Sequence, residues 1–362
     1  MKKIILTSVM LFAQIGAACT GFGIITDHGT LIGKNRDYFY GPQKFGLILP
    51  LKKLDNWQGN LYHHHNQFYA LTAKSNQKYE LSAKVDLSMG VNQAGLTAIE
   101  EDTFRPSEIK KQRMFYQPYQ GIDVNTLLYG VLQNFNTIDE MIPFLSKIFS
   151  VAAPDFYQFS DAKKVLTVEV AFGKNNKDPK RAFTYKIISK KNAYTTHTNA
   201  YVSPKFTELN KWAKPNSLAG AQNRLTKITN LISQAKERNI AVAPSWFLNT
   251  SSRVSKVDDK NWCQNTSLFR SNLKGLTSID TNVANDKVGG TVSSMIVENN
   301  GDFKQSYLYL KMVESVTTLK NHDQLIKYKV LHTSLAKLFS GEKLVFVPHE
   351  FVRKAPVKGV CS

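Results

Sequence analysis

Residues 19–37 read CTGFGIITDHGTLIGKNRD and give the clearest local structural prediction in the chain. This stretch holds two short runs with the composition and length of strands, at 21–26 and 30–35, joined by an Asp-His-Gly turn signal. The stretch therefore predicts a β-hairpin. This hairpin carries Cys19 at one end and Asp37 just past the other.

Upstream of the hairpin, residues 1–18 have the pattern of a removable secretory signal. Two lysines and an apolar run precede the small residues Gly16-Ala17-Ala18, and the run is too short for a transmembrane helix. Cleavage after these small residues would make Cys19 the new N-terminus. We therefore expect an exported protein, periplasmic or extracellular, with residues 19–362 as one domain.

The chain has three cysteines, Cys19, Cys263 and Cys361. In an oxidising compartment the last two could pair, which would leave Cys19 as the odd thiol. At this position Cys19 is a nucleophile, a lipid attachment site or an unremarkable residue at the signal boundary. Bacterial lipoproteins favour a leucine three residues before the cysteine, where this chain has Gly16.

An N-terminal cysteine brings its own general base. Its α-amine titrates at about 7.7–8.0 in model peptides, so it can accept the thiol proton near neutral pH. The hairpin places Asp37 across from Cys19, where a carboxylate would orient the amine. Lys34, in the same hairpin, would lower the pKa of the thiol.

Composition places the chain among globular proteins. Of 362 residues, 42% are hydrophobic and 21% are charged, which excludes collagen-like and disordered classes. The net charge is +19, but the basic residues are scattered and no nucleic-acid motif accompanies them. We expect a solvated basic surface, no nucleic-acid partner and no stable membrane insertion.

Periodicity and turn signals indicate strand runs, then helices, then strands again, which favours one α+β domain built on antiparallel sheets. A tight hairpin turn is expected at 92–95 and a capping box at Thr137–Glu140. The further strands are expected at 45–50, 67–73, 79–89, 165–172, 182–189, 193–198, 291–298 and 303–312. The helices are expected at 123–135, 141–149 and 219–236.

Several motifs then occur in an order that resembles one family. Cys19-Thr20 followed by Gly33-Lys34-Asn35-Arg36-Asp37 resembles the opening of the choloylglycine hydrolase and penicillin acylase/acyltransferase group. Residues 90–96, GVNQAGL, resemble its Gly-x-Asn-Glu-x-Gly-Leu turn, and Thr198-Asn199 resembles a Thr-Asn pair at a strand end. Arg224 falls where that group has an arginine at the opening of a helix. The resemblance implies an N-terminal-nucleophile fold, an αββα sandwich of two antiparallel sheets flanked by helices.

The resemblance also implies roles for the matching residues. Cys19 would be the nucleophile, and Asn199 would supply an oxyanion or thiol contact. The other catalytic candidates are Asp37, Lys34 and Arg224. Asn92 and Asp102 are candidates for substrate or oxyanion binding, although the spacing around Asn92 also favours a turn former.

Two positions depart from the family pattern. Lys34 replaces an arginine, which keeps the charge but loses the fork geometry. Asp102 replaces an asparagine, and a carboxylate donates to an oxyanion only when it is protonated. With Glu100 and Glu101 it forms an acidic run, which we expect to be solvated or bound by lysines.

The implied activity is hydrolysis of a linear amide C–N bond in an N-acyl substrate through an acyl-enzyme. Bile-salt conjugates, penicillin V, N-acyl amino acids and N-acyl lactones all offer such a bond. The alternatives are a secreted dipeptidase of the same superfamily and a lipid-anchored, non-enzymatic binding protein acylated at Cys19. A small-molecule substrate is the expected partner, and the sequence also allows a homo-oligomer. We expect no cofactor and no metal, since no ligand spacing supports the histidine run at 63–65.

Overall fold

The hairpin predicted from residues 19–37 is present. In the computed structural model, strand β1 (Thr20–Ile25) pairs antiparallel with β2 (Thr30–Phe39). The turn is closed by a hydrogen bond of 2.8 Å from the Thr26 amide to the Gly29 carbonyl. The structure describes residues 19–39, 43–51, 64–73, 87–103, 122–171, 182–213, 215–237, 289–319 and 324–353. The signal sequence, Cys263 and Cys361 lie outside these ranges.

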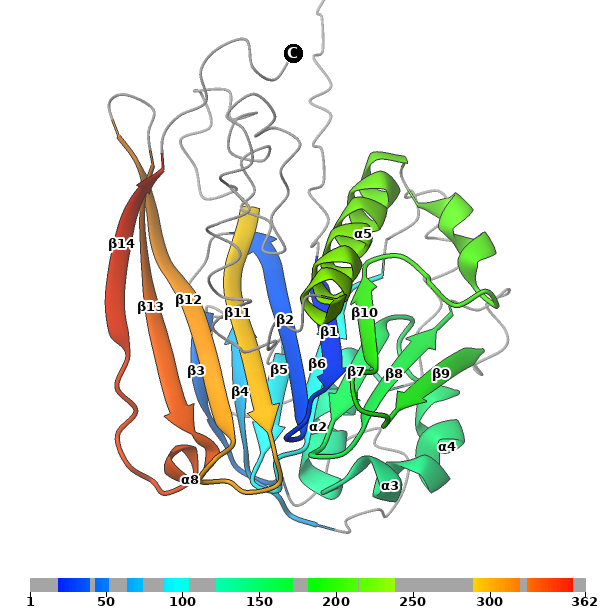
Figure 1. The fold of residues 1–362 in the computed structure, drawn as a ribbon, viewed down its shortest axis with the longest axis horizontal. Helices are drawn as coiled ribbons and strands as arrows, with labels where there is room; N and C mark the ends of the chain where they lie inside the picture. Colours follow the sequence, from blue (N-terminus) through cyan, green and yellow to red (C-terminus); the bar gives the residue numbers. More distant parts are fainter. Residues whose placement is uncertain are drawn as a thin grey trace, which may run out of the picture.

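The described residues form two antiparallel seven-stranded sheets (Figure 1). We call the sheet that contains the hairpin sheet A. Its strands in spatial order are β10 (Tyr194–Thr198), β1, β2, β11 (Gly289–Asn299), β12 (Tyr307–Thr318), β13 (Gln324–Ser334) and β14 (Val347–Arg353). Sheet B has the order β3 (Gln43–Ile48), β4 (Phe68–Ala73), β5 (Leu87–Asn92), β6 (Thr97–Glu101), β7 (Phe156–Ser160), β8 (Val165–Val170) and β9 (Phe183–Ile188).

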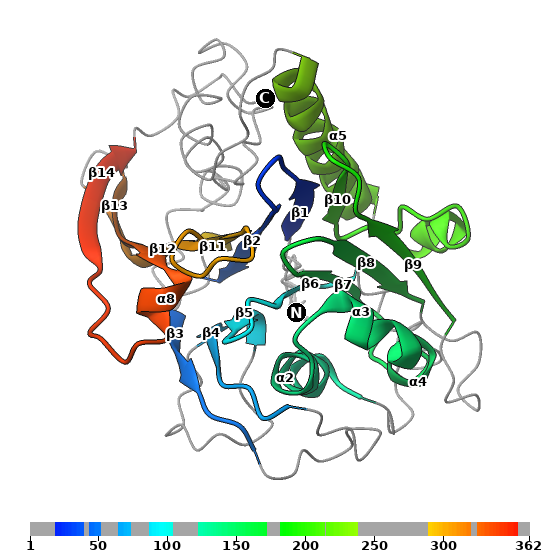
Figure 2. The same cartoon turned by 60° about the horizontal axis from the view of Figure 1, so that its bottom comes forward.

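Helices cover the outer faces of both sheets (Figure 2). Helix α5 (Pro215–Glu237) packs on sheet A beside β1 and β10, and α2 (Val124–Asn134) packs on β5 and β6 of sheet B. The shorter helical segments are α3 (Ile138–Met141), η1 (Ile142–Phe144), α4 (Leu145–Phe149), η2 (Thr207–Trp212) and α8 (Leu335–Leu338). The predicted αββα arrangement is therefore confirmed.

Three apolar layers hold these elements together. Side chains such as Ile32, Val91 and Leu310 fill the space between the two sheets. A second cluster joins sheet B to α2, α3 and α4. A third joins Phe22 of β1 to Ile228 and Ile232 of α5, because buried residues recur on that helix at three- and four-residue spacing.

Most predicted elements in the described ranges occur within a few residues of their expected bounds, whereas residues 79–86 of the strand expected at 79–89 lie outside those ranges. Asp123 caps α2 by accepting from the Thr126 amide, and Thr137 caps α3 by accepting from the Glu140 amide. The helix predicted at 141–149 is wrong in one respect, because it is broken into a 3-10 turn and a short α-helix at Pro143. Proline cannot donate the backbone hydrogen bond that a continuous helix needs. No helix in the described ranges is long and apolar enough to cross a membrane.

Candidate functional site

Cys19 lies directly before β1 and is buried. Along β1, Phe22 and Ile24 face α5, so the alternate positions face sheet B. The pairing of Thr20 with Thr198 and with Asn35, continued by one residue, puts Cys19 between Asn199 and Arg36. Cys19 is therefore at the start of β1, on the face between the two sheets.

Lys34 is a buried cation two residues away in register, since it pairs with Gly21 on β1. Its Nζ donates to the Ser88 Oγ at 2.8 Å and to the Glu100 carbonyl, and it forms an ion pair with Glu100 Oε2 at 3.2 Å. Burial acts to lower the pKa of Lys34, but the negative charges of Cys19, Glu100 and Glu101 outweigh it and hold the pKa above its ordinary value. The ammonium group is therefore charged, and its charge would favour ionisation of the Cys19 thiol.

Asn199 and Arg224 are brought together, as the sequence predicts. Arg224, on the buried face of α5, donates from Nη2 to Asn199 Oδ1 at 2.8 Å. The Asn199 Nδ2 donates to the backbone carbonyl of Asp102 at 2.5 Å. An amide carries two hydrogens, so the second remains for an oxyanion. Asp102 thus joins this part of the site through its backbone, without any need for its side chain to donate.

The side chain of Asp37 lies outside what the structure describes. Its backbone is in β2, where Asp37 pairs with Thr291 of β11 beside an irregularity in the strand register. This places Asp37 next to Arg36, the residue opposite Cys19. The contact between Asp37 and the Cys19 amine stays a prediction.

Asn92 lies away from this group. Lys34 contacts Ser88 near the start of β5, and Asn92 is four residues farther along the strand, roughly 13 Å away. Both amide hydrogens of Asn92 donate to the end of α2, to the carbonyls of Leu132 and Phe135 at 2.8 Å. Its Oδ1 accepts from the amides of Ala94 and Leu96. The geometry favours the turn-forming role of Asn92.

The acidic run at 100–102 is buried at its first two residues. Glu100 is 7% exposed and Glu101 is 0% exposed, so neither is solvated, and Glu100 is instead bound by a lysine, the other alternative expected for this run. In the described part of the chain, Glu100, Asp102 and Asp155 place carboxylate oxygens within 4.8 Å of one another, the spacing that a metal ion would need. Lys34 already supplies a positive charge to Glu100.

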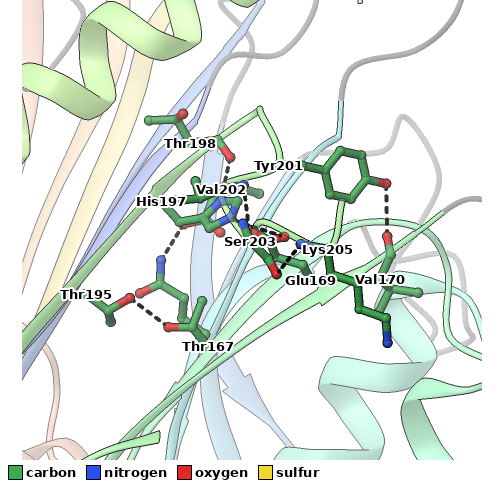
Figure 3. A network of polar contacts seen from close by, with 12 residues as sticks. Thr167, Glu169, Val170, Thr195, His197, Thr198, Tyr201, Val202, Ser203 and Lys205 are labelled. Atoms are coloured by element: carbon green, nitrogen blue, oxygen red, sulfur yellow. Dashed lines mark hydrogen bonds and ion pairs between the residues drawn. The ribbon is translucent and has the colours of Figure 1, made fainter. Parts of the chain in front are cut away.

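His197 was missed by the sequence analysis and is buried on β10, opposite Gly21. Its Nε2 lies 3.0 Å from Glu169 Oε1, and its Nδ1 lies 2.6 Å from the Thr198 carbonyl. Figure 3 shows this network, in which Glu169 also accepts from the amides of Val202 and Ser203. Burial acts to lower the pKa of His197, but the hydrogen bond and charge of Glu169 outweigh it and raise the pKa. Because both ring nitrogens face oxygen acceptors, the ring is held as an imidazolium.

These residues place several reactive and polar groups together at the start of β1. A thiol stands beside a buried ammonium, and an amide held by Arg224 offers one hydrogen nearby. Attack on a carbonyl needs a nucleophile whose ionised form is stabilised by a cation and a hydrogen-bond donor for the oxyanion that forms. Arg36, which is 4% exposed, is a further charged residue beside Cys19 that only the register reveals.

The chain is similar to known proteins in structure and in sequence. A crystal structure of a mutant of the conjugated bile acid hydrolase from Clostridium perfringens is similar over 91% of this chain and 97% of that chain, with 13% sequence identity and a TM-score of 0.49. No curated protein sequence matches significantly. The model of the family described as acyl-coenzyme A:6-aminopenicillanic acid acyl-transferase matches residues 25–266. Because this match covers more than half of the chain, the protein belongs to that family, and its predicted class, an enzyme acting on carbon–nitrogen bonds in linear amides, is confirmed.

Proposed function

We propose that the protein is an exported cysteine N-terminal-nucleophile hydrolase that cleaves the amide bond of a small N-acyl substrate. The observation that carries the proposal is the place of Cys19. It is buried at the start of β1, between the two sheets, with the Lys34 ammonium close enough for the two charges to interact. The secretory pattern of residues 1–18, whose removal would expose this cysteine, supports the proposal.

In the proposed reaction the Cys19 sulfur attacks the amide carbonyl carbon while the α-amine of Cys19 takes the thiol proton. The carbonyl π electrons move to oxygen, and the oxyanion accepts a hydrogen bond from the second amide hydrogen of Asn199. When the C–N bond breaks, the amine proton passes to the leaving nitrogen. Water then attacks the thioester, which releases the carboxylic acid and restores the thiol.

The surrounding residues prepare this reaction. Lys34 favours the thiolate by its charge, and Arg224 fixes the orientation of Asn199 through its hydrogen bond. Asp37 would orient the α-amine. Bile-salt, penicillin V, N-acyl amino acid and N-acyl lactone substrates all carry the amide bond that this mechanism cleaves.

The test begins with N-terminal sequencing of the exported protein, which should start at Cys19 with a free amine. Exported protein is then assayed on a panel of N-acyl amides and on dipeptides. Cys19→Ser should lose nearly all turnover while keeping the thermal unfolding midpoint. A fully active Cys19→Ser variant contradicts the mechanism. Turnover of dipeptides alone favours the dipeptidase, and a diacylglyceryl mass on Cys19 favours the lipid-anchored binding protein.

The control replaces the other two cysteines. A variant with Cys263→Ser and Cys361→Ser keeps Cys19 as its only thiol, and it should retain turnover. This control separates loss of the nucleophile from a general effect of removing cysteine.

Acyl transfer is a second candidate, because the matching family is described as an acyl-transferase. Water and an amine would compete for the same thioester at Cys19. Adding 6-aminopenicillanic acid to the assay distinguishes them. A new N-acyl product indicates transfer, and release of free acid alone indicates hydrolysis.

A further inference from the structure

A buried carboxylate from sheet B reaches sheet A beneath the nucleophile. Glu101, at the end of β6, is 0% exposed. A methyl group placed on Gly21 would come within 1.8 Å of Glu101 Oε1. The missing side chain at position 21 is therefore the space that Glu101 occupies. Because Gly21 is two residues from Cys19 on the same face of β1, the carboxylate lies roughly 7 Å along the strand from the cysteine.

The hydrogen bonds of Glu101 are incomplete in a specific way. Its Oε1 accepts from Gln158 Nε2 at 3.2 Å. Its Oε2 and the Gln158 Oε1 are both buried, and neither has a hydrogen-bond partner among the residues that the structure describes. Two such oxygens on a pair of bonded side chains lack a donor. A proton on Glu101 Oε2 would remove the need for a donor at that oxygen.

Charged groups surround this carboxylate on several strands. On sheet A, Gly21 pairs with Lys34 on one side and with His197 on the other. Both positive charges interact with Glu101 and favour its ionised form. The other charged groups around them are Arg36 on β2, Glu100 on β6 and Glu169 on β8.

We infer that Glu101 is a positioning residue that binds a proton beneath Cys19 and thereby couples the ionisation of the thiol to pH. This inference rests on the proposed function, in which the Cys19 thiolate is the nucleophile. Glu101 acts through charge, because it touches Gly21 and Gln158 and interacts with the Lys34 ammonium that stabilises the thiolate. When Glu101 is protonated, the positive charge of Lys34 stabilises the Cys19 thiolate in full. When Glu101 is ionised, its negative charge partly cancels this stabilisation.

The direction of the effect follows from burial. Burial raises the pKa of Glu101 to about 7, although the charges of His197 and Lys34 act to lower it. Below this pH the carboxyl is neutral and resembles a glutamine. Above it, a negative charge stands near Cys19 and raises the pKa of the thiol.

The test measures the rate of iodoacetamide alkylation of Cys19 from pH 5 to 9, read by peptide mass mapping of the exported protein. In Glu101→Gln we expect the inflection of the rate profile to move to lower pH by about one unit, or about tenfold in rate on the rising limb. Superimposable profiles overturn the inference. The glutamine should be tolerated, because it has nearly the size of glutamate and leaves no charge to bury.

Two further variants keep the test decisive. Glu101→Asp retains a carboxylate and should restore a profile close to that of the wild type. Glu298→Gln also removes a half-buried charge from sheet A, but Glu298 pairs with Leu31, about 17 Å along β2 from Arg36. Its profile should follow the wild type, and a shift equal to that of Glu101→Gln would overturn the inference. Alkylation needs no substrate, so a failure to hydrolyse amides bears on the proposed function alone.

Discussion

Lys34 is 1% exposed, yet it is a charged residue in the centre of a strand. Its ammonium is satisfied by Ser88 on β5 and by Glu100 on β6, two strands of the facing sheet. Buried charges persist in proteins when they are paired and hydrogen bonded. Lys34 therefore joins the two sheets at the same point where it supports Cys19.

Replacing this lysine should cost stability as well as activity. Lys34→Met removes the ammonium that is paired with the buried Glu100, and we expect the free energy of unfolding to fall by about 3–5 kcal/mol. The control is Lys191→Met, which breaks the exposed ion pair with Asp27 and should cost less than about 1 kcal/mol. Urea unfolding of both variants measures the difference. Equal losses would contradict the structural role of the buried pair.

The space above Gly21 can be tested by a pair of substitutions. Gly21→Ala should destabilise the protein, because the new methyl group would lie 1.8 Å from Glu101 Oε1. Combining it with Glu101→Ala removes the closest contact and leaves only the end of the Gln158 side chain, with Nε2 at 2.9 Å. We expect the double variant to unfold at a higher temperature than Gly21→Ala alone, as read by circular dichroism. A double variant less stable than Gly21→Ala would show that Glu101 does not fill this space.

At the level of single residues, the sequence could predict what is local. Residue spacing within the hairpin was enough to predict that Cys19 and Lys34 lie close together, because both belong to one supersecondary unit. The positions of Glu101 and His197 could not be predicted in this way. Their approach to Gly21 depends on how sheet B packs on sheet A and on the pairing of β10 with β1. A glycine with no turn to form, in the middle of a strand, was the available signal.

The turn between β5 and β6 shows how one side chain organises an element. Gly95 has a φ of 83°, which glycine adopts without strain. Asn92 bonds this turn to itself and to the end of α2 with four hydrogen bonds. The turn therefore depends on Asn92 for stability. The four hydrogen bonds of this side chain all go to the turn or to the end of α2.

This role predicts a separation of stability from reactivity. Asn92→Ala leaves buried donors and acceptors without partners, and we expect a loss of about 3 kcal/mol in unfolding free energy. The folded variant should alkylate Cys19 at the rate of the wild type. Asn300→Ala, in the exposed turn before β12, is the control and should cost about 1 kcal/mol or less. A large loss of Cys19 reactivity with unchanged stability would contradict this prediction and would indicate that Asn92 acts in the active site.

Elements with a periodic pattern or a cap could be predicted, and others could not. Helix α2 has apolar residues at helical spacing behind a capping aspartate, so its bounds were predicted within one residue. Strands β7, β13 and β14 were not predicted. Residues 156–160, FYQFS, are buried on both faces, which removes the alternation that marks a half-exposed strand. In β13 and β14, lysines and histidines alternate with apolar residues too irregularly to be distinguished from a loop.

For the whole molecule, burial of Glu101 makes stability depend on pH. Its pKa is about 7 in the folded chain and near the ordinary carboxyl value of about 4.3 when unfolded. The neutral form is favoured by folding, so this contribution is present below about pH 4 and is lost as the pH rises through 7. Between pH 4 and pH 8 the wild type should lose about 3 kcal/mol relative to Glu101→Gln.

Urea unfolding at both pH values measures this loss. The control is Glu342→Gln, which removes an exposed carboxylate near Lys337 and should follow the wild type across the range. A constant difference between the wild type and Glu101→Gln at pH 4 and pH 8 would contradict the account. That outcome would mean that Glu101 has the same proton affinity in the folded and unfolded chain.

The architecture as a whole was predictable because the family motifs occur in order along the chain, and the family match over residues 25–266 confirms the family. The pairing of the two sheets, which decides the site, was not predictable. It joins β1 to β6 and β7, segments that lie far apart in the sequence. The cleaved signal, the role of Asp37 and the exported location stay predictions.

The role of Cys19 as an N-terminal nucleophile is tested most directly by mass spectrometry of the exported protein, quenched in acid during turnover of an N-acyl amide. We expect a chain that begins at Cys19 and an acyl group on that residue in part of the sample. A chain that begins elsewhere, a diacylglyceryl group on Cys19, or turnover with no acyl group on this cysteine would contradict it.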